Sequence, residues 1–140
     1  MNSVFLRLAS MLILAGSLAQ ACSCFTPTAF AARKSAGIIF RGKITGFRDT
    51  GRGTPMVVFA VDRVWKGDVP RTFEMPALKE TFGCVGFWPT YLEIGKNLLV
   101  YAFQINGKGD YFTSICFRTA PVEDTRDVFS LGFGYTPNSK

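Results

Sequence analysis

The chain has 140 residues, a formal net charge of +6, four cysteines and no histidine. The missing histidine excludes Ser–His and Cys–His catalytic pairs and the commonest zinc ligand, while the carboxylates are scattered and no glycine-rich loop is placed to hold a phosphate. We therefore expect no enzyme, and because the Lys and Arg residues form no dense run, we expect no nucleic-acid binding.

The first 21 residues are predicted to be a cleaved secretory signal peptide. A basic residue lies near the start, residues 11–18 are an apolar run, and residues 19–21 (Ala-Gln-Ala) fit a small-x-small cleavage site. The apolar run is shorter than the roughly 20 residues that a membrane-spanning helix needs. We therefore expect a secreted or periplasmic protein without a membrane span. Residues 18–22 also loosely match a bacterial lipobox, so a lipoprotein anchored at Cys22 is the alternative.

Cleavage after Ala21 would make Cys22 the first residue, followed directly by Ser23 and Cys24. The α-amine and the carbonyl of one residue can chelate a metal ion together, and few positions in a sequence offer this pair of ligands. A disulfide through the same residue would hold the chelating group in place. These three residues are therefore the strongest candidates for function in the chain.

Four cysteines in an exported chain predict two disulfides, because export places the chain in an oxidising compartment. A bond between Cys22 and Cys24 would close a very tight ring and is disfavoured by geometry. Two pairings remain open on this reasoning. They are Cys22 with Cys84 and Cys24 with Cys116, or Cys22 with Cys116 and Cys24 with Cys84.

The rest of the sequence predicts strands with little helix. Apolar and aromatic residues alternate with polar ones, and turn-forming residues separate the runs. Gly42 and Gly46 predict a bulge or sharp curvature within the first strand. The predicted elements are a short helix over residues 27–34, strands over residues 38–47, 56–65, 71–75, 97–105 and 111–117, and a second short helix over residues 121–129.

These elements predict an all-β domain with one or two short helices. Five strands with intervening glycines fit a five-stranded Greek-key barrel of the OB type, which the disulfides would cross-link. We expect this domain to cover residues 22–131. Residues 132–140 carry Gly, Pro and Ser and are expected to form a flexible tail.

Residues 22–24 (Cys-Ser-Cys) and 27–30 (Pro-Thr-Ala-Phe) resemble the start of the tissue inhibitors of metalloproteinases, which begin Cys-Ser/Thr-Cys and soon reach an Ala-Phe segment. Four later segments resemble that family in the same order and at similar spacing. They are residues 64–67 (Val-Trp-Lys-Gly), 83–87 (Gly-Cys-Val-Gly-Phe), 93–96 (Glu-Ile-Gly-Lys) and 113–116 (Thr-Ser-Ile-Cys). The chain looks like a single-domain relative of prokaryotic type, and the resemblance covers most of residues 22–121.

The resemblance implies an NTR-like domain of the OB type with disulfides Cys22–Cys84 and Cys24–Cys116. In that family the amine and carbonyl of the first cysteine bind the catalytic zinc of a protease. Carried over, Cys22 would chelate the zinc of the target, and the chain would need no cofactor of its own. The other residues implied for the inhibitory wedge are Ser23, beside the zinc, Cys24, Phe25 and Thr26, along the cleft, and Gly83, Cys84 and Val85, against its other half.

We therefore expect a secreted, monomeric inhibitor of zinc metalloendopeptidases. The alternative is a non-inhibitory exported module that binds a cell-envelope or extracellular partner. In that case residues 22–24 would serve only to form structural disulfides. The chain departs from the family at Phe25, where the family usually has a smaller residue, and at Ala31, where it has a cysteine of a third disulfide. The state of the Cys22 amine separates the two hypotheses, because a lipidated or blocked amine cannot chelate.

Overall fold

The structure is a computed structural model that describes residues 22–79 and 84–138. The predicted signal peptide over residues 1–21 and the predicted site residue Gly83 lie outside these ranges. Within the described ranges, no helix is both long enough and apolar enough to cross a membrane.

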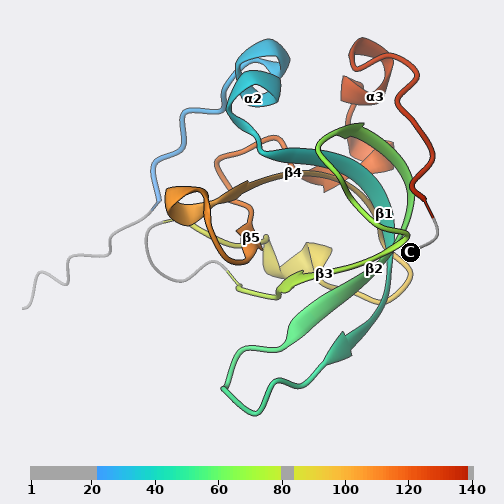
Figure 1. Ribbon diagram of the computed structural model, residues 1–140. Helices are drawn as coiled ribbons and strands as arrows, with labels where there is room; N and C mark the ends of the chain where they lie inside the picture. The colour runs from blue at the N-terminus through green and yellow to red at the C-terminus, as the bar shows by residue number, and fades with distance from the viewer. Residues whose placement is uncertain (1–21, 80–83, 139–140) are drawn as a thin grey trace, which may run out of the picture.

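The chain forms a six-stranded antiparallel sheet with two short α-helices, which confirms the predicted mostly-β class (Figure 1). The strand order is β3-β2-β1-β4-β5, and β6 also pairs with β4. The strands are β1 (Ile38–Arg48), β2 (Met56–Lys66), β3 (Thr72–Pro76), β4 (Asn97–Gln104), β5 (Tyr111–Phe112) and β6 (Ala120–Pro121). The helices are α2 (Ala29–Ser35) and α3 (Asp127–Ser130), with 3₁₀ turns η2 (Pro89–Tyr91), η3 (Ile105–Gly107) and η4 (Val122–Asp124).

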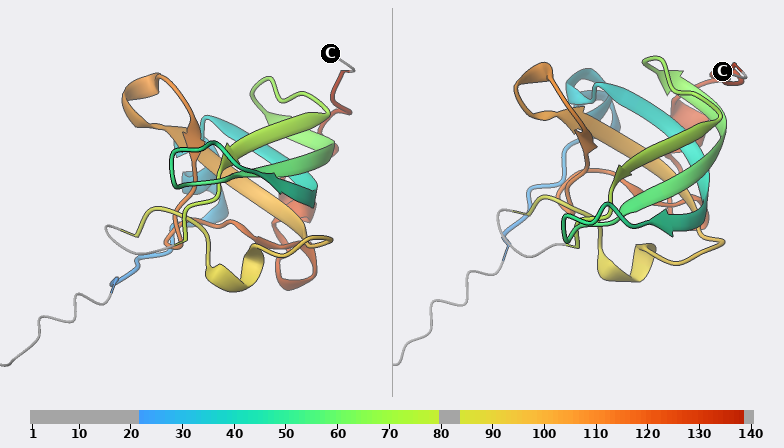
Figure 2. Two further views of the ribbon diagram at one scale, coloured as in Figure 1. Left: turned by 90° about the horizontal axis from the view of Figure 1, so that it is seen from below. Right: turned by 60° about the horizontal axis from the view of Figure 1, so that its bottom comes forward.

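Strand β1 lies at the centre of the sheet and pairs with both β2 and β4. Its register against β2 shifts at Gly42 and again just before Gly46, which confirms the irregularities predicted at these glycines. A Cβ atom on Gly42 would lie 3.2 Å from side-chain atoms of Phe40 and Phe59, so the strand approaches the core closely here. Bulges of this kind bend a strand and increase its twist. They let the sheet wrap around its own core (Figure 2).

The two edges of the curved sheet approach each other through side chains. The rings of Phe73 on β3 and Tyr111 on β5 pack edge to face with their centroids 6.0 Å apart. Among the described residues, no backbone ladder joins β3 to β5. The sheet has six strands where five were predicted, and closure into an OB-type barrel stays a prediction.

The predicted strand over residues 111–117 is wrong beyond Phe112, where β5 ends. Two threonine side chains take over hydrogen bonds that a longer ladder would make to β4. The Thr113 hydroxyl donates to the Tyr101 carbonyl (2.9 Å), and the Thr119 hydroxyl accepts from the Tyr101 backbone nitrogen (2.9 Å). The chain is therefore free to turn after β5 and to bring Cys116 towards the N-terminal segment.

The sheet buries apolar residues on both of its faces. The inner face carries the main core, which includes Phe40, Phe59 and Phe87. The outer face of β1 and β4 carries a second cluster, in which Ile39, Leu99 and Tyr101 lie under α2 and α3. The residues that these helices contribute are Ala32 and Ala36, from α2 and its C-terminal end, and Leu131, which follows α3. Both helices therefore lie on the same side of the sheet (Figure 1).

The segment from Gly132, predicted to be a flexible tail, is hydrogen-bonded to the rest of the domain as far as Pro137. Tyr135 and Val64 exchange two such bonds, of 2.8 and 2.7 Å. The Arg71 side chain donates to the Pro137 carbonyl (3.2 Å). These contacts attach the described part of the segment to the end of β2 and to the turn before β3.

We expect Gly67→Ala to lower the free energy of unfolding by about 2–4 kcal/mol. Gly67 has a φ of +79°, and a Cβ atom there would lie 2.5 Å from Ile38 Cγ2 and 2.9 Å from the Gly37 carbonyl oxygen. Gly51→Ala is the matched control, because Gly51 has a φ of +65° but no atom within 4 Å of the added carbon. We expect it to cost only the roughly 1 kcal/mol of a positive φ. Equal losses in urea unfolding would contradict the steric argument.

Candidate functional site

The first described residues form an exposed segment that runs to the start of α2. Residues 22–28 have no regular secondary structure. Ser23, Cys24, Phe25 and Thr26 are all exposed, and Phe25 is 92% accessible to solvent. Four consecutive residues of the predicted wedge are therefore accessible to another protein.

Two disulfides fix this segment to distant parts of the chain, which confirms the predicted disulfide bonding. They join Cys22 to Cys84, with Cα atoms 5.7 Å apart, and Cys24 to Cys116, with Cα atoms 4.9 Å apart. This is the pairing that the family resemblance implies. Because disulfides persist in oxidising surroundings, they indicate an extracellular or periplasmic compartment.

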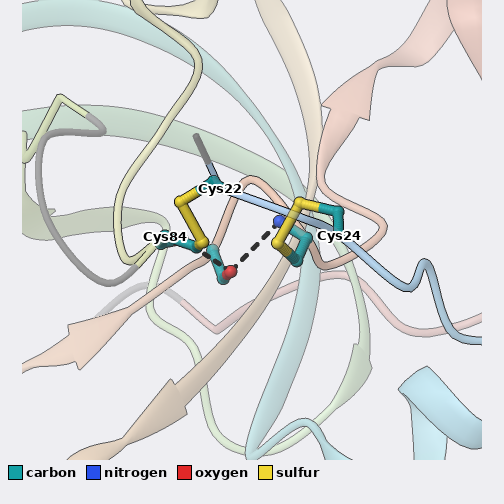
Figure 3. The surroundings of a disulfide bond; sticks show 5 residues. Cys22, Cys24 and Cys84 are labelled. Carbon is teal, nitrogen blue, oxygen red and sulfur yellow. Dashed lines mark hydrogen bonds between the residues drawn. A yellow bond between two sulfur atoms is a disulfide. The ribbon is translucent and has the colours of Figure 1, made fainter. Parts of the chain in front are cut away.

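A hydrogen-bonded bridge joins the two disulfides to each other (Figure 3). The Ser114 hydroxyl donates to the Cys84 carbonyl (2.7 Å) and accepts from the Cys116 backbone nitrogen (3.1 Å). Cys84 has a φ of +61°, a left-handed conformation that few residues other than glycine adopt. Its neighbour Val85 forms an isolated bridge with Ser114. The two disulfides and Ser114 therefore form one connected unit.

A second attachment holds the segment just before α2. Arg118 donates one hydrogen bond to the Pro27 carbonyl (3.1 Å) and two to the carboxylate of Asp127 (2.5 and 2.6 Å). Asp127 is 5% exposed and also accepts from the Tyr101 hydroxyl (2.9 Å). The Thr28 hydroxyl then caps α2 by accepting from the Ala31 backbone nitrogen (3.2 Å). Residues 22–28 are thus tied down at both ends.

The ionic contacts of this attachment shift the pKa values of its members. Hydrogen bonds from Arg118 lower the pKa of Asp127 below its usual value, although burial opposes this change. Burial, and then the hydrogen bond to Asp127, raises the pKa of Tyr101. At neutral pH Asp127 is therefore ionised and Tyr101 protonated, which is the state that their hydrogen bond requires.

We expect Asp127→Asn to lower the free energy of unfolding by about 2 kcal/mol at pH 7, because it leaves Arg118 without its charged partner. A lowered pKa means that ionised Asp127 stabilises the fold above the unfolded-state pKa, near 3.9. This contribution is lost as the pH falls through the lower, folded-state pKa. Urea unfolding should therefore show that the gap between the two proteins shrinks in acid.

The control for this variant is Asp62→Asn, which breaks the Arg41–Asp62 ion pair on the surface. The Asp62 side chain is 57% exposed, and exposed pairs are worth about 1 kcal/mol or less. A loss at Asp127 no greater than that at Asp62 would contradict the role given to the buried carboxylate.

The N-terminal segment also forms one wall of a surface hollow of about 360 Å³. Its lining includes Cys24 and Thr26 from this segment and the aromatic residues Trp88 and Tyr91. Sequence reasoning did not single out these two aromatic residues, because an isolated aromatic side chain is ordinary in a β-rich core. The hollow gives a partner protein a concave surface directly beside the exposed segment.

The structure brings together most of the residues predicted for the wedge. Cys22 and Cys24 are joined to one unit with Cys84 and Val85, while Ser23, Phe25 and Thr26 project from the connecting segment. Gly83 lies outside the described residues. Sequence reasoning missed Ser114, Arg118 and Asp127, which attach this unit to the fold.

The chain matches no protein-family model and no curated protein. In the part of the chain that the structure describes, no three His, Cys, Asp or Glu side chains lie close enough to hold a metal ion.

Proposed function

We propose that the protein inhibits zinc metalloendopeptidases by presenting the amine and carbonyl of Cys22 to the catalytic zinc of the target. The observation that carries this proposal is the segment over residues 22–26, which is half-buried at Cys22, exposed from residue 23 onward, and held at both of its cysteines by disulfides. The ordered motifs that resemble the tissue inhibitors of metalloproteinases support the same mechanism.

The chemistry follows from the open coordination position of a catalytic zinc. Such a zinc has three protein ligands and a fourth position that holds water or substrate. The amine nitrogen and carbonyl oxygen of Cys22 form a five-membered chelate that can displace this water. The chelate needs a first residue with an unblocked amine, which removal of residues 1–21 would generate.

Rigidity explains how so few atoms could bind tightly. A flexible peptide loses conformational freedom when it binds, and this loss opposes affinity. Here Cys22 and Cys24 are already fixed, and Arg118 holds the carbonyl of Pro27. The segment can therefore enter a protease cleft with little further ordering.

The exposed side chains of the segment would set the specificity. Ser23 would point into the pocket beside the zinc, and Cys24, Phe25 and Thr26 would follow the cleft. Val85, beside Cys84, would contact the other half of the cleft together with Gly83. Phe25 is large and almost fully exposed, so we expect targets whose cleft accepts an aromatic side chain at this position.

The test is an inhibition assay against a panel of zinc endopeptidases. The protein is purified from its native compartment and its N-terminus and intact mass are determined. We expect a first residue Cys22 without an acyl chain, two disulfides, and inhibition of at least one member of the panel. A blocked or lipidated Cys22, or no inhibition by protein with a free amine, would overturn the proposal and favour a binding module instead.

A further inference from the structure

Three phenylalanines are exposed on the side of the sheet that α2 and α3 cover. Phe30 on α2 is 79% exposed, Phe129 on α3 is 82% exposed, and Phe133 is 96% exposed. A soluble protein normally buries side chains of this size, and exposed apolar groups gathered on one face mark an interaction site. None of these residues belongs to the wedge.

The two helices form one continuous surface. A hollow of about 390 Å³ lies between them, and its lining includes Phe30 and Arg33 from α2 together with Ser130 from α3. Beneath it, residues of both helices pack on the same outer cluster of the sheet. Phe30 and the segment that carries Phe129 are therefore neighbours.

The segment that carries Phe133 returns to the same region. The Trp65 indole nitrogen donates to the carbonyl of Gly132 (2.8 Å), directly before Phe133. The next residue of β2, Lys66, donates to the carbonyls of Arg33 and Lys34 at the end of α2 (2.8 and 3.1 Å). The Trp65 side chain packs against the same outer cluster as the two helices, so the chain around Gly132 and Phe133 lies on that side of the sheet.

The charged residues of α2 and of the segment around α3 are mainly basic, although exposed Asp68 lies near Tyr135, two residues after Phe133. Exposed cations accompany the phenylalanines at Arg33 and Lys34 in α2 and at Arg126 before α3, and none of the three forms an ion pair with another described residue. The only carboxylate within α2 and residues 126–134 is Asp127, which is buried and paired with Arg118. Asp124, just before this segment, lines the hollow beside Trp88 instead.

We propose that this phenylalanine surface, made of Phe30, Arg33, Lys34, Arg126, Phe129 and Phe133, docks the protein on the surface of an anionic phospholipid bilayer. Exposed aromatic residues enter the boundary between lipid headgroups and acyl chains, while Lys and Arg are attracted to anionic headgroups. The two contributions reinforce each other only where they share a face, as they do here. The disulfides place the protein on the outer side of a cytoplasmic membrane, where it would meet such a surface.

The experiment is co-sedimentation with vesicles, using protein that starts at Cys22 and carries no acyl chain by intact mass. We expect binding to vesicles of phosphatidylglycerol and phosphatidylcholine in equal parts, little binding to pure phosphatidylcholine, and loss of binding at about 0.5 M salt. Phe129→Ser/Phe133→Ser should weaken binding about tenfold or more. Phe25→Ser, which removes an equally exposed ring outside this surface, should leave binding unchanged.

The charges are tested in the same way. Arg33→Gln/Lys34→Gln should weaken binding to the anionic vesicles, whereas Lys43→Gln/Lys108→Gln, which removes two exposed cations elsewhere, should have a much smaller effect. Each variant is first shown to unfold at the same urea concentration as the parent.

Three outcomes would overturn the proposal. They are an absence of vesicle binding, equal binding to neutral vesicles, and no effect of the double Phe variant. A dimer in solution that the same Phe variant dissociates would assign the surface to a second copy instead. The outcome does not depend on protease inhibition, so the two proposals can fail separately.

Discussion

One alanine added before Cys22 should weaken inhibition of a susceptible zinc protease by about a hundredfold or more. The added residue converts the α-amine into an amide nitrogen, which is neither basic nor free to coordinate zinc. The carbonyl of Cys22 alone then remains as a single, weak ligand. The fold should be unaffected, because the Cys22–Cys84 disulfide still attaches the start of the segment to the domain. The measurement is the inhibition constant against the most sensitive enzyme of the panel.

The same alanine added after the last residue is the control, and it should leave inhibition unchanged. Intact mass must show two disulfides in both proteins, and their melting temperatures must agree. The pH dependence of inhibition is a second test of whether the Cys22 amine binds the zinc. Its reference pKa is near 8, so the unprotonated fraction falls as the pH falls, and inhibition should weaken with it. If the extended protein inhibits as strongly as the parent, the chelation mechanism is wrong.

Most of the sheet could be predicted from the sequence because its pattern is local. The first four strands begin and end within one residue of their predicted bounds. In β1 and β2 buried apolar residues recur with a period near two, β4 is a continuous apolar run buried on both faces, and turn residues mark the ends of the strands. The bulges at Gly42 and Gly46 were equally visible, since a glycine inside a strand often marks a bulge or a tight bend.

The last part of the sheet could not be predicted because its hydrogen bonds come from side chains. The threonines Thr113 and Thr119 bind the backbone of Tyr101, which is 12 and 18 residues away in the sequence. Residues 111–117 (Tyr-Phe-Thr-Ser-Ile-Cys-Phe) are also rich in aromatic and β-branched residues, which have high strand propensity, so the pattern favoured a longer strand. Nothing local distinguishes a threonine that extends a ladder from one that replaces it.

Some residues of the candidate site could likewise be predicted from the sequence, and others could not. Cys22 and Cys24 were visible because their position after a cleavage site is rare. Arg118 was not, since its partner Pro27 lies 91 residues away and offers only a backbone carbonyl. Nothing in the sequence distinguishes Asp127 from a surface carboxylate, whereas in the fold it begins α3 and lies beside Tyr101. The candidate residues of the wedge could thus be proposed from the sequence, and the contacts that hold them required the structure.

Removal of the second disulfide, by Cys24→Ser/Cys116→Ser, should strongly lower the stability of the protein. This bond closes a loop with a sequence separation of 92 residues, for which the loop-entropy model gives about 4.6 kcal/mol, and measured losses are typically about 2–5 kcal/mol. We therefore expect the free energy of unfolding to fall by about 2–5 kcal/mol in urea titrations. Ser114 loses part of its role as well, because the Cys116 backbone that it contacts is no longer tied to the N-terminal segment.

The same variant should also weaken inhibition, by about tenfold or more, because residues 23–26 must then be ordered on binding. Loss of stability alone could produce a similar decrease if part of the protein were unfolded in the assay. Gly67→Ala separates the two causes, because it removes a comparable free energy of unfolding at a turn that contacts Gly37 and Ile38 and not the segment. Assayed where both variants are fully folded by circular dichroism, Gly67→Ala should inhibit like the parent and the disulfide variant should not. Equal inhibition by both variants would show that the disulfide stabilises the fold without pre-ordering the wedge.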